Sequence, residues 1–86
     1  MAEASVEDRL KNLIARRLFL KIAPEAIDVN KSLMDAYGVD SVSLLELVVG
    51  VEEEFGVTIP DEEFSIKHFE TVAALAAFVR GKLGAG

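Results

Sequence analysis

Apolar residues recur along most of this chain at the three- and four-residue spacing of amphipathic helices. The first such stripe follows Ser5, whose spacing to Asp8 is typical of a helix start, and it consists of Val6, Leu10, Leu13, Ile14 and Leu18. This helix is expected to end around Leu20, because Pro24 is not tolerated in a helix interior.

Two further helices follow from the positions of capping residues. Asp40 is a favourable N-cap residue, and Gly56 is a favourable residue to terminate a helix that ends at Phe55. A last helix is expected to begin after Thr71, with an apolar face formed by Val72, Leu75, Ala76, Val79 and Leu83.

The segments between these helices are irregular. Residues 23–39 predict a long connecting loop that apolar side chains anchor to the core, namely Ile27, Val29, Leu33 and Met34. A loop of this length in a small domain is more often functional than not. Residues 60–64 predict a short helical turn with Pro60 near its start. The expected fold is therefore all-α, a four-helix bundle of three main helices plus one short helix.

Composition restricts what this bundle can do. The 86 residues predict one domain over 1–86, ordered from about 5 to 83 with frayed termini, and half of them are apolar. No cysteine is present, which excludes a disulfide, a thiol nucleophile and a thiolate metal site. His68 is the only histidine, so neither a zinc site nor a nucleophile and base pair is expected. We therefore expect a protein that is not an enzyme and that has no metal site.

Charge and hydropathy point to a cytoplasmic protein that binds other proteins. The net charge is −6, and residues 32–66 contain nine acidic side chains and no basic one. This anionic block disfavours nucleic acid as a partner. No apolar run reaches the length that spans a bilayer, and the N-terminus does not resemble a secretory signal, so no membrane insertion is expected.

The helix that follows Asp40 has apolar residues on two faces. An ordinary core stripe is formed by Leu44, Leu47, Val48, Val51 and Phe55. The opposite side carries Val42, Leu45 and Val49, with carboxylates around them at Glu46, Glu52 and Glu53. An apolar strip edged by carboxylates is typical of a docking surface for a basic, partly apolar partner. The alternative is that the loop 23–39 covers Val42 or Leu45.

Ser41 follows the expected cap and lies in the first turn of this helix. The free N–H groups and the positive end of the helix dipole would stabilise a phosphate there. Asp40 beside it could hold a divalent cation during phosphoryl transfer. On these grounds alone, a serine near a helix start is more often only helix-start chemistry.

A family resemblance changes that balance. Residues 38–47, which read GVDSVSLLEL, resemble the G-x-D-S-L motif of acyl carrier proteins. Residues 51–63, VEEEFGVTIPDEE, are similar to the acidic segment that follows in that family, and Thr71-Val72 resembles the start of its last helix. The similarity extends over residues 5–83, nearly the whole chain.

The resemblance implies a carrier with a covalent cofactor. Ser41 would be attached to 4′-phosphopantetheine from coenzyme A, whose thiol carries acyl intermediates of fatty-acid, lipid or polyketide-type biosynthesis as thioesters. Asp40 would take part in metal-assisted transfer of the cofactor. The partners would be a phosphopantetheinyl transferase and acyl-loading and acyl-processing enzymes with basic docking patches. Val42, Leu45, Glu46, Val49, Glu52 and Glu53 would contact them, and the carrier would act as a monomer.

A core pocket for the acyl chain is expected as well, because burial of each CH₂ group is favourable by about 0.8 kcal/mol. The residues expected to line it are Leu47, Val51, Phe55, Ile59 and Ala73. Other large side chains are interpreted more simply. Phe19, Phe64, Phe69 and Phe78 are expected in or against the core, and Arg16 and Arg17 are expected only to complement the helix dipole.

Two positions depart from the family pattern. Ser43 stands where the commonest carriers of fatty-acid synthesis have Asp, and Tyr37 stands where Leu is usual. These differences favour a specialised carrier over a housekeeping one. Two alternatives remain open: a peptidyl or aryl carrier of a nonribosomal synthetase, and a carrier-like docking module that never receives the cofactor.

Overall fold

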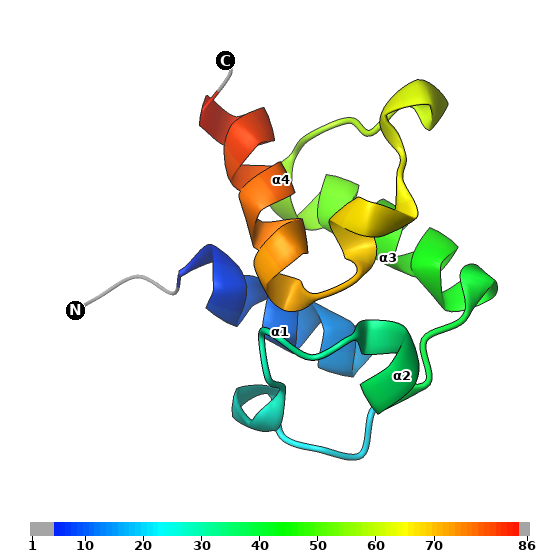
Figure 1. The fold of residues 1–86 in the computed structure, drawn as a ribbon. Coiled ribbons are helices and arrows are strands. Elements are labelled where there is room, and N and C mark those ends of the chain that lie inside the picture. Colours follow the sequence, from blue (N-terminus) through cyan, green and yellow to red (C-terminus); the bar gives the residue numbers. More distant parts are fainter. Residues whose placement is uncertain (1–4, 85–86) are drawn as a thin grey trace.

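The computed structural model describes residues 5–84, and the ends predicted to be frayed, 1–4 and 85–86, lie outside the described residues. The four α-helices are α1 (Val6–Arg17), α2 (Leu33–Tyr37), α3 (Ser41–Phe55) and α4 (Val72–Gly84). Three single turns of 3₁₀-helix lie in the connections: η1 (Pro24–Ala26), η2 (Asp61–Glu63) and η3 (Ile66–Phe69). The expected all-α bundle is confirmed, and no strand occurs within residues 5–84 (Figure 1).

Helix α1 starts as the sequence predicts and ends earlier. The Ser5 hydroxyl accepts a hydrogen bond from the Asp8 N–H at 3.1 Å. The helix ends at Arg17 instead of Leu20, because Phe19 adopts a left-handed conformation with φ 54° and the Leu20 N–H bonds back to the Ala15 carbonyl. The Phe19 side chain is consequently 87% exposed, so the prediction that it lies in the core is wrong.

The short α-helix lies within the segment expected to be a loop. Residues 33–37 form α2, with the Ser32 hydroxyl accepting from the Asp35 N–H at 3.2 Å. The turn predicted at Pro60–Phe64 is only one turn of 3₁₀-helix, η2. The short helical turn predicted at 60–64 is thus present, and the prediction that residues 23–39 form only a loop is wrong at 33–37, where Ser32 caps α2.

Backbone hydrogen bonds tie this connection to the start of α4. The Leu33 N–H donates to the Glu70 carbonyl at 2.8 Å, and the Ala73 N–H donates to the Val29 carbonyl at 2.9 Å. Within the connection itself, the Tyr37 hydroxyl accepts from the Asp28 N–H at 2.8 Å and so joins its two halves. Hydrogen bonds at Val29 and at Leu33 thus attach both halves of the connection between α1 and α3 to the segment around the start of α4.

The remaining helix boundaries agree with the sequence. Asp40 caps α3, Gly56 ends it with φ 66°, and the Thr71 hydroxyl accepts from the Ala74 N–H at 3.0 Å to cap α4. Of the apolar face predicted for α4, only Leu83 is exposed.

The core lies between α1, α3 and α4, with contributions from the connections. Its buried side chains are Leu10, Leu13, Ile14, Ile27, Leu33, Val39, Leu44, Leu47, Val51, Phe55, Ile59, Phe69, Val72, Leu75, Ala76 and Val79. Helix α1 packs closely on both α3 and α4, which contact each other less. No helix within residues 5–84 is long and apolar enough to cross a membrane.

Candidate functional site

The start of α3 is placed by a left-handed glycine. Gly38 ends α2 with φ 68°, a conformation that glycine adopts without strain, and the chain then extends through Val39 and Asp40 into α3. Val39 is buried and anchors this junction, whereas Asp40 and Ser41 are exposed. In Figure 1 the chain passes from α2 into the N-terminal end of α3, whose first residue is Ser41.

The Asp40 carboxylate is the N-cap of α3. Its Oδ1 accepts from the Ser43 N–H at 2.8 Å, and this hydrogen bond, with a further one from the Ser43 side chain, lowers the pKa of Asp40. Ser43, which stands where the commonest carriers of fatty-acid synthesis have Asp, therefore places a hydroxyl donor beside the Asp40 carboxylate instead of a second negative charge. With its pKa lowered, Asp40 is ionised at neutral pH, and this exposed residue directly precedes Ser41 in the sequence.

The apolar strip on the outer side of α3 is open to solvent. Val42 is 70% exposed, Leu45 is 63% exposed and Val49 is 45% exposed. The connection 23–39 covers none of them, so the alternative in which it shields Val42 or Leu45 is wrong. Three branched aliphatic side chains thus lie in water along one helix face, next to Ser41.

The three carboxylates expected around this strip have different surroundings. Glu46 and Glu53 are exposed, and both approach Arg17 of α1. Glu52 is half-buried, and its Oε2 accepts from the Ile59 N–H at 2.7 Å. Glu52 therefore fixes the segment that follows α3, while Glu46 and Glu53 remain on the outer side.

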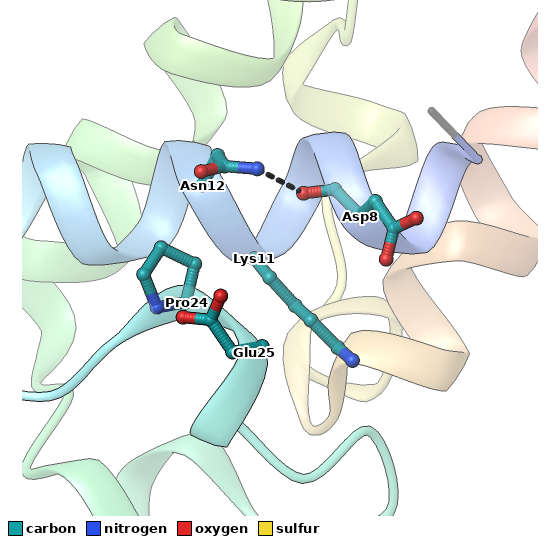
Figure 2. A pocket seen from close by; sticks show the side chains of 5 residues that line it. All are labelled: Asp8, Lys11, Asn12, Pro24 and Glu25. Atoms are coloured by element: carbon teal, nitrogen blue, oxygen red, sulfur yellow. Dashed lines mark hydrogen bonds between the residues drawn. The ribbon is translucent and has the colours of Figure 1, made fainter. Parts of the chain in front are cut away.

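The residues expected to line an acyl pocket lie together in the interior. Leu47, Val51, Phe55 and Ile59 are buried, and Ala73 is half-buried at the start of α4. Two surface pockets of the described residues are lined by other side chains. One lies between α1 and η1, where Asp8, Lys11, Asn12, Pro24 and Glu25 surround it (Figure 2). The other lies beside Phe78 and Lys82 on α4.

Arg17 is the residue that sequence reasoning missed. It was expected only to complement the helix dipole, yet its guanidinium ion-pairs with Glu53 and approaches Glu46 to 4.0 Å. Its neighbour Arg16 instead reaches Glu54, which Arg9 also binds through Nε at 3.1 Å. The signal was the lack of any basic residue in 32–66, which makes the arginines of α1 natural partners for the carboxylates of α3.

Other residues singled out in the sequence have structural surroundings. His68 stacks on Phe78, with ring centroids 4.3 Å apart. Phe64 and Phe69 pack together with centroids 5.3 Å apart. Within residues 5–84, no group of three histidine or acidic side chains is arranged to hold a metal ion.

Comparison with known proteins identifies similar chains. Residues 8–79 match the family model described as "phosphopantetheine attachment site". An acyl carrier protein of Renibacterium salmoninarum is 43% identical over 58 residues, which are 67% of this chain and 69% of that protein. An acyl carrier protein of an Arthrobacter species is 41% identical over the same shares of each chain.

Solved structures agree in fold. The solution structure of a holo acyl carrier protein from Nitrosomonas europaea superimposes with a TM-score of 0.82, at 26% identity, over 94% of this chain and 99% of that one. The structure of apo KstB-PCP superimposes with a TM-score of 0.72, at 28% identity, over 86% of this chain and 81% of that one.

Proposed function

This chain belongs to the phosphopantetheine-binding family of acyl carrier proteins, which are carriers and not catalysts, and we propose that Ser41 is where its cofactor is attached. The single observation that supports this most strongly is the placement of an exposed serine hydroxyl at the first residue of α3, directly after the Asp40 cap. When bound, 4′-phosphopantetheine supplies a thiol, which this cysteine-free chain lacks.

The surroundings of Ser41 fit a phosphodiester. The hydroxyl is exposed, and the first turn of a 15-residue helix favours negative charge. Asp40 remains ionised because the Ser43 N–H lowers its pKa, and the carboxylate is adjacent to the hydroxyl that reacts. We infer that Asp40 positions the divalent cation that accompanies cofactor transfer.

We propose that partner enzymes bind the outer side of α3. The docking surface consists of Val42, Leu45 and Val49 with the carboxylates of Glu46 and Glu53, and Glu52 lies at its edge. The exposed aliphatic side chains supply apolar contact, and the carboxylates favour partners with basic patches through fast, salt-dependent encounter. Partners of this kind are the phosphopantetheinyl transferase and the enzymes that load and process the acyl group.

An attached acyl chain is proposed to enter the interior beside α3. The residues concerned are Leu47, Val51, Phe55, Ile59 and Ala73, and the looser contact between α3 and α4 supports entry there. Each buried CH₂ group would favour this state by about 0.8 kcal/mol. The family of the chain supports biosynthesis of fatty acids, lipids or polyketides as its setting, and cytoplasmic location and the monomeric state stay predictions.

The attachment site is tested by loading the chain with coenzyme A and a broad-specificity phosphopantetheinyl transferase. Trypsin leaves Ser41 and Ser43 in one peptide, because residues 32–66 contain no basic side chain. Fragment-ion mass spectrometry of that peptide is therefore needed. We expect the cofactor on Ser41, with Ser43→Ala still loaded. Cofactor on Ser43 would contradict the assignment, and a chain that is never loaded would favour the docking-module alternative.

The docking surface is tested by Leu45→Gln. Since Leu45 is 63% exposed, the substitution should leave the melting temperature nearly unchanged and should raise the KM of the transferase for this carrier. Leu83→Gln on α4, where the side chain is also exposed, serves as the matched control. Equal KM values for the two variants would contradict the placement of the docking surface.

A further inference from the structure

Arg17 lies across the acidic side of α3 although it belongs to α1. Its Nη2 pairs with Glu53 Oε1, and its Nη1 is 4.0 Å from Glu46 Oε2. These two carboxylates are seven residues apart, which is about 10.5 Å along a helix axis. One guanidinium therefore lies between both acidic residues of the docking surface.

Gly50 provides the space for this crossing. Gly50 is buried, and in the sequence of α3 it lies between Glu46 and Glu53. A Cβ atom at this position would lie 3.2 Å from Arg17 Nε and 3.5 Å from Arg17 Cγ. The same atom would lie 3.1 Å from Leu13 Cδ1. The stem of Arg17 thus occupies the space that any other residue at position 50 would fill.

We propose that Arg17 determines which partners bind this docking surface, because it occupies in cis the place of a partner's basic side chain. A partner that offers basic groups only opposite Glu46 and Glu53 must displace a guanidinium that is already there. The surface therefore favours partners that add apolar contact with Val42, Leu45 and Val49 to their basic groups over partners that offer basic groups alone. This inference rests on the proposed function, and it adds a residue outside α3 to the determinants of docking.

The contact is perturbed in two independent ways. Arg17→Gln removes the positive charge, and Arg16→Gln is its matched control, since it removes the same charge from the next residue, which pairs with Glu54 instead. Gly50→Ala leaves every charge in place and adds a Cβ atom 3.2 Å from Arg17 Nε and 3.1 Å from Leu13 Cδ1, so both side chains must shift by a few tenths of an ångström. Thermal melting establishes that each variant is folded.

The measurement is kcat/KM for loading by the same transferase at low and high salt. At low salt we expect Arg17→Gln and Gly50→Ala to raise kcat/KM about two- to five-fold through KM, the range for an exposed ion pair. The kcat/KM of Arg16→Gln should remain near that of the unchanged chain. The gain should disappear at about 1 M salt, where the Debye length is about 3 Å. The double variant should gain no more than either single one.

Two results would overturn this inference while leaving the proposed function intact: loading of Arg17→Gln at the rate of Arg16→Gln, or loading of folded Gly50→Ala at the unchanged rate when its carboxylate shifts show that the contact is lost. A chain that is not loaded at all would instead refute the proposed function. The contact itself is tested without the transferase by the ¹³C shifts of the Glu46 and Glu53 carboxylates. They should move in Arg17→Gln, and less in Gly50→Ala, but not in Arg16→Gln, and unmoved shifts in Arg17→Gln would refute the contact.

Discussion

Glu52 and Glu53 are adjacent in α3, yet the structure predicts opposite consequences for their removal. Glu52 Oε2 accepts the Ile59 N–H at 2.7 Å, and Ile59 is buried. Glu53 is exposed and forms an ion pair with Arg17. Substitution of each by alanine changes the helix propensity equally, so the difference between the two variants isolates these surroundings.

The magnitudes follow from burial. Glu52→Ala leaves the Ile59 N–H without its acceptor, which costs about 1–3 kcal/mol. Each kcal/mol of lost stability lowers the melting temperature of a domain of this size by about 4–8 °C. A loss of about 2 kcal/mol, the middle of the expected energy range, therefore lowers it by about 8–16 °C. Glu53→Ala removes an exposed ion pair worth at most about 1 kcal/mol.

The assay is urea denaturation followed by far-UV circular dichroism, with Glu52→Gln as a third variant. The glutamine amide oxygen can still accept the Ile59 N–H, so this variant should lose about half as much stability as Glu52→Ala. The reasoning would be refuted if Glu52→Ala were no less stable than Glu53→Ala. It would also be refuted if Glu52→Gln lost as much stability as Glu52→Ala.

Two further predictions concern stability. Phe19→Gly should stabilise the domain by about 1 kcal/mol in urea denaturation, because Phe19 is exposed and left-handed at the end of α1, and a loss of stability would contradict this. The pKa of Glu7 is lowered by its hydrogen bond with Arg80, and that of Asp40 is lowered by the Ser43 N–H. Each ionised carboxylate stabilises the folded chain fully at pH values above its pKa in the unfolded chain. This stabilisation is lost as the pH falls through the lower pKa of the folded chain, so the melting temperature should decrease below about pH 4. The melting temperature of Glu7→Gln should decrease less steeply with falling pH than that of the unchanged chain, and parallel curves for the two would contradict this linkage.

The elements with strong local signals could be predicted from the sequence. Asp40 and Gly56 bound α3 because a capping carboxylate and a left-handed glycine act locally. The exposed strip at Val42, Leu45 and Val49 followed from helical periodicity, since that face opposes the core stripe.

The features that depend on tertiary contact could not be predicted in the same way. Helix α2 is only five residues long, and the hydrogen bond from Leu33 to Glu70 that fixes its start joins distant segments. Arg17 reaches Glu46 and Glu53 only because α1 packs against α3 at Gly50. The inward turn of Glu52 depends on how the chain returns at Ile59.

The measurement that tests the central claim most directly is the intact mass of the folded chain after incubation with coenzyme A and the transferase, beside Ser41→Ala. The account predicts a gain of one phosphopantetheine in the unchanged chain and none in Ser41→Ala. A gain in Ser41→Ala, or no gain in the unchanged and initially unmodified chain, would contradict it.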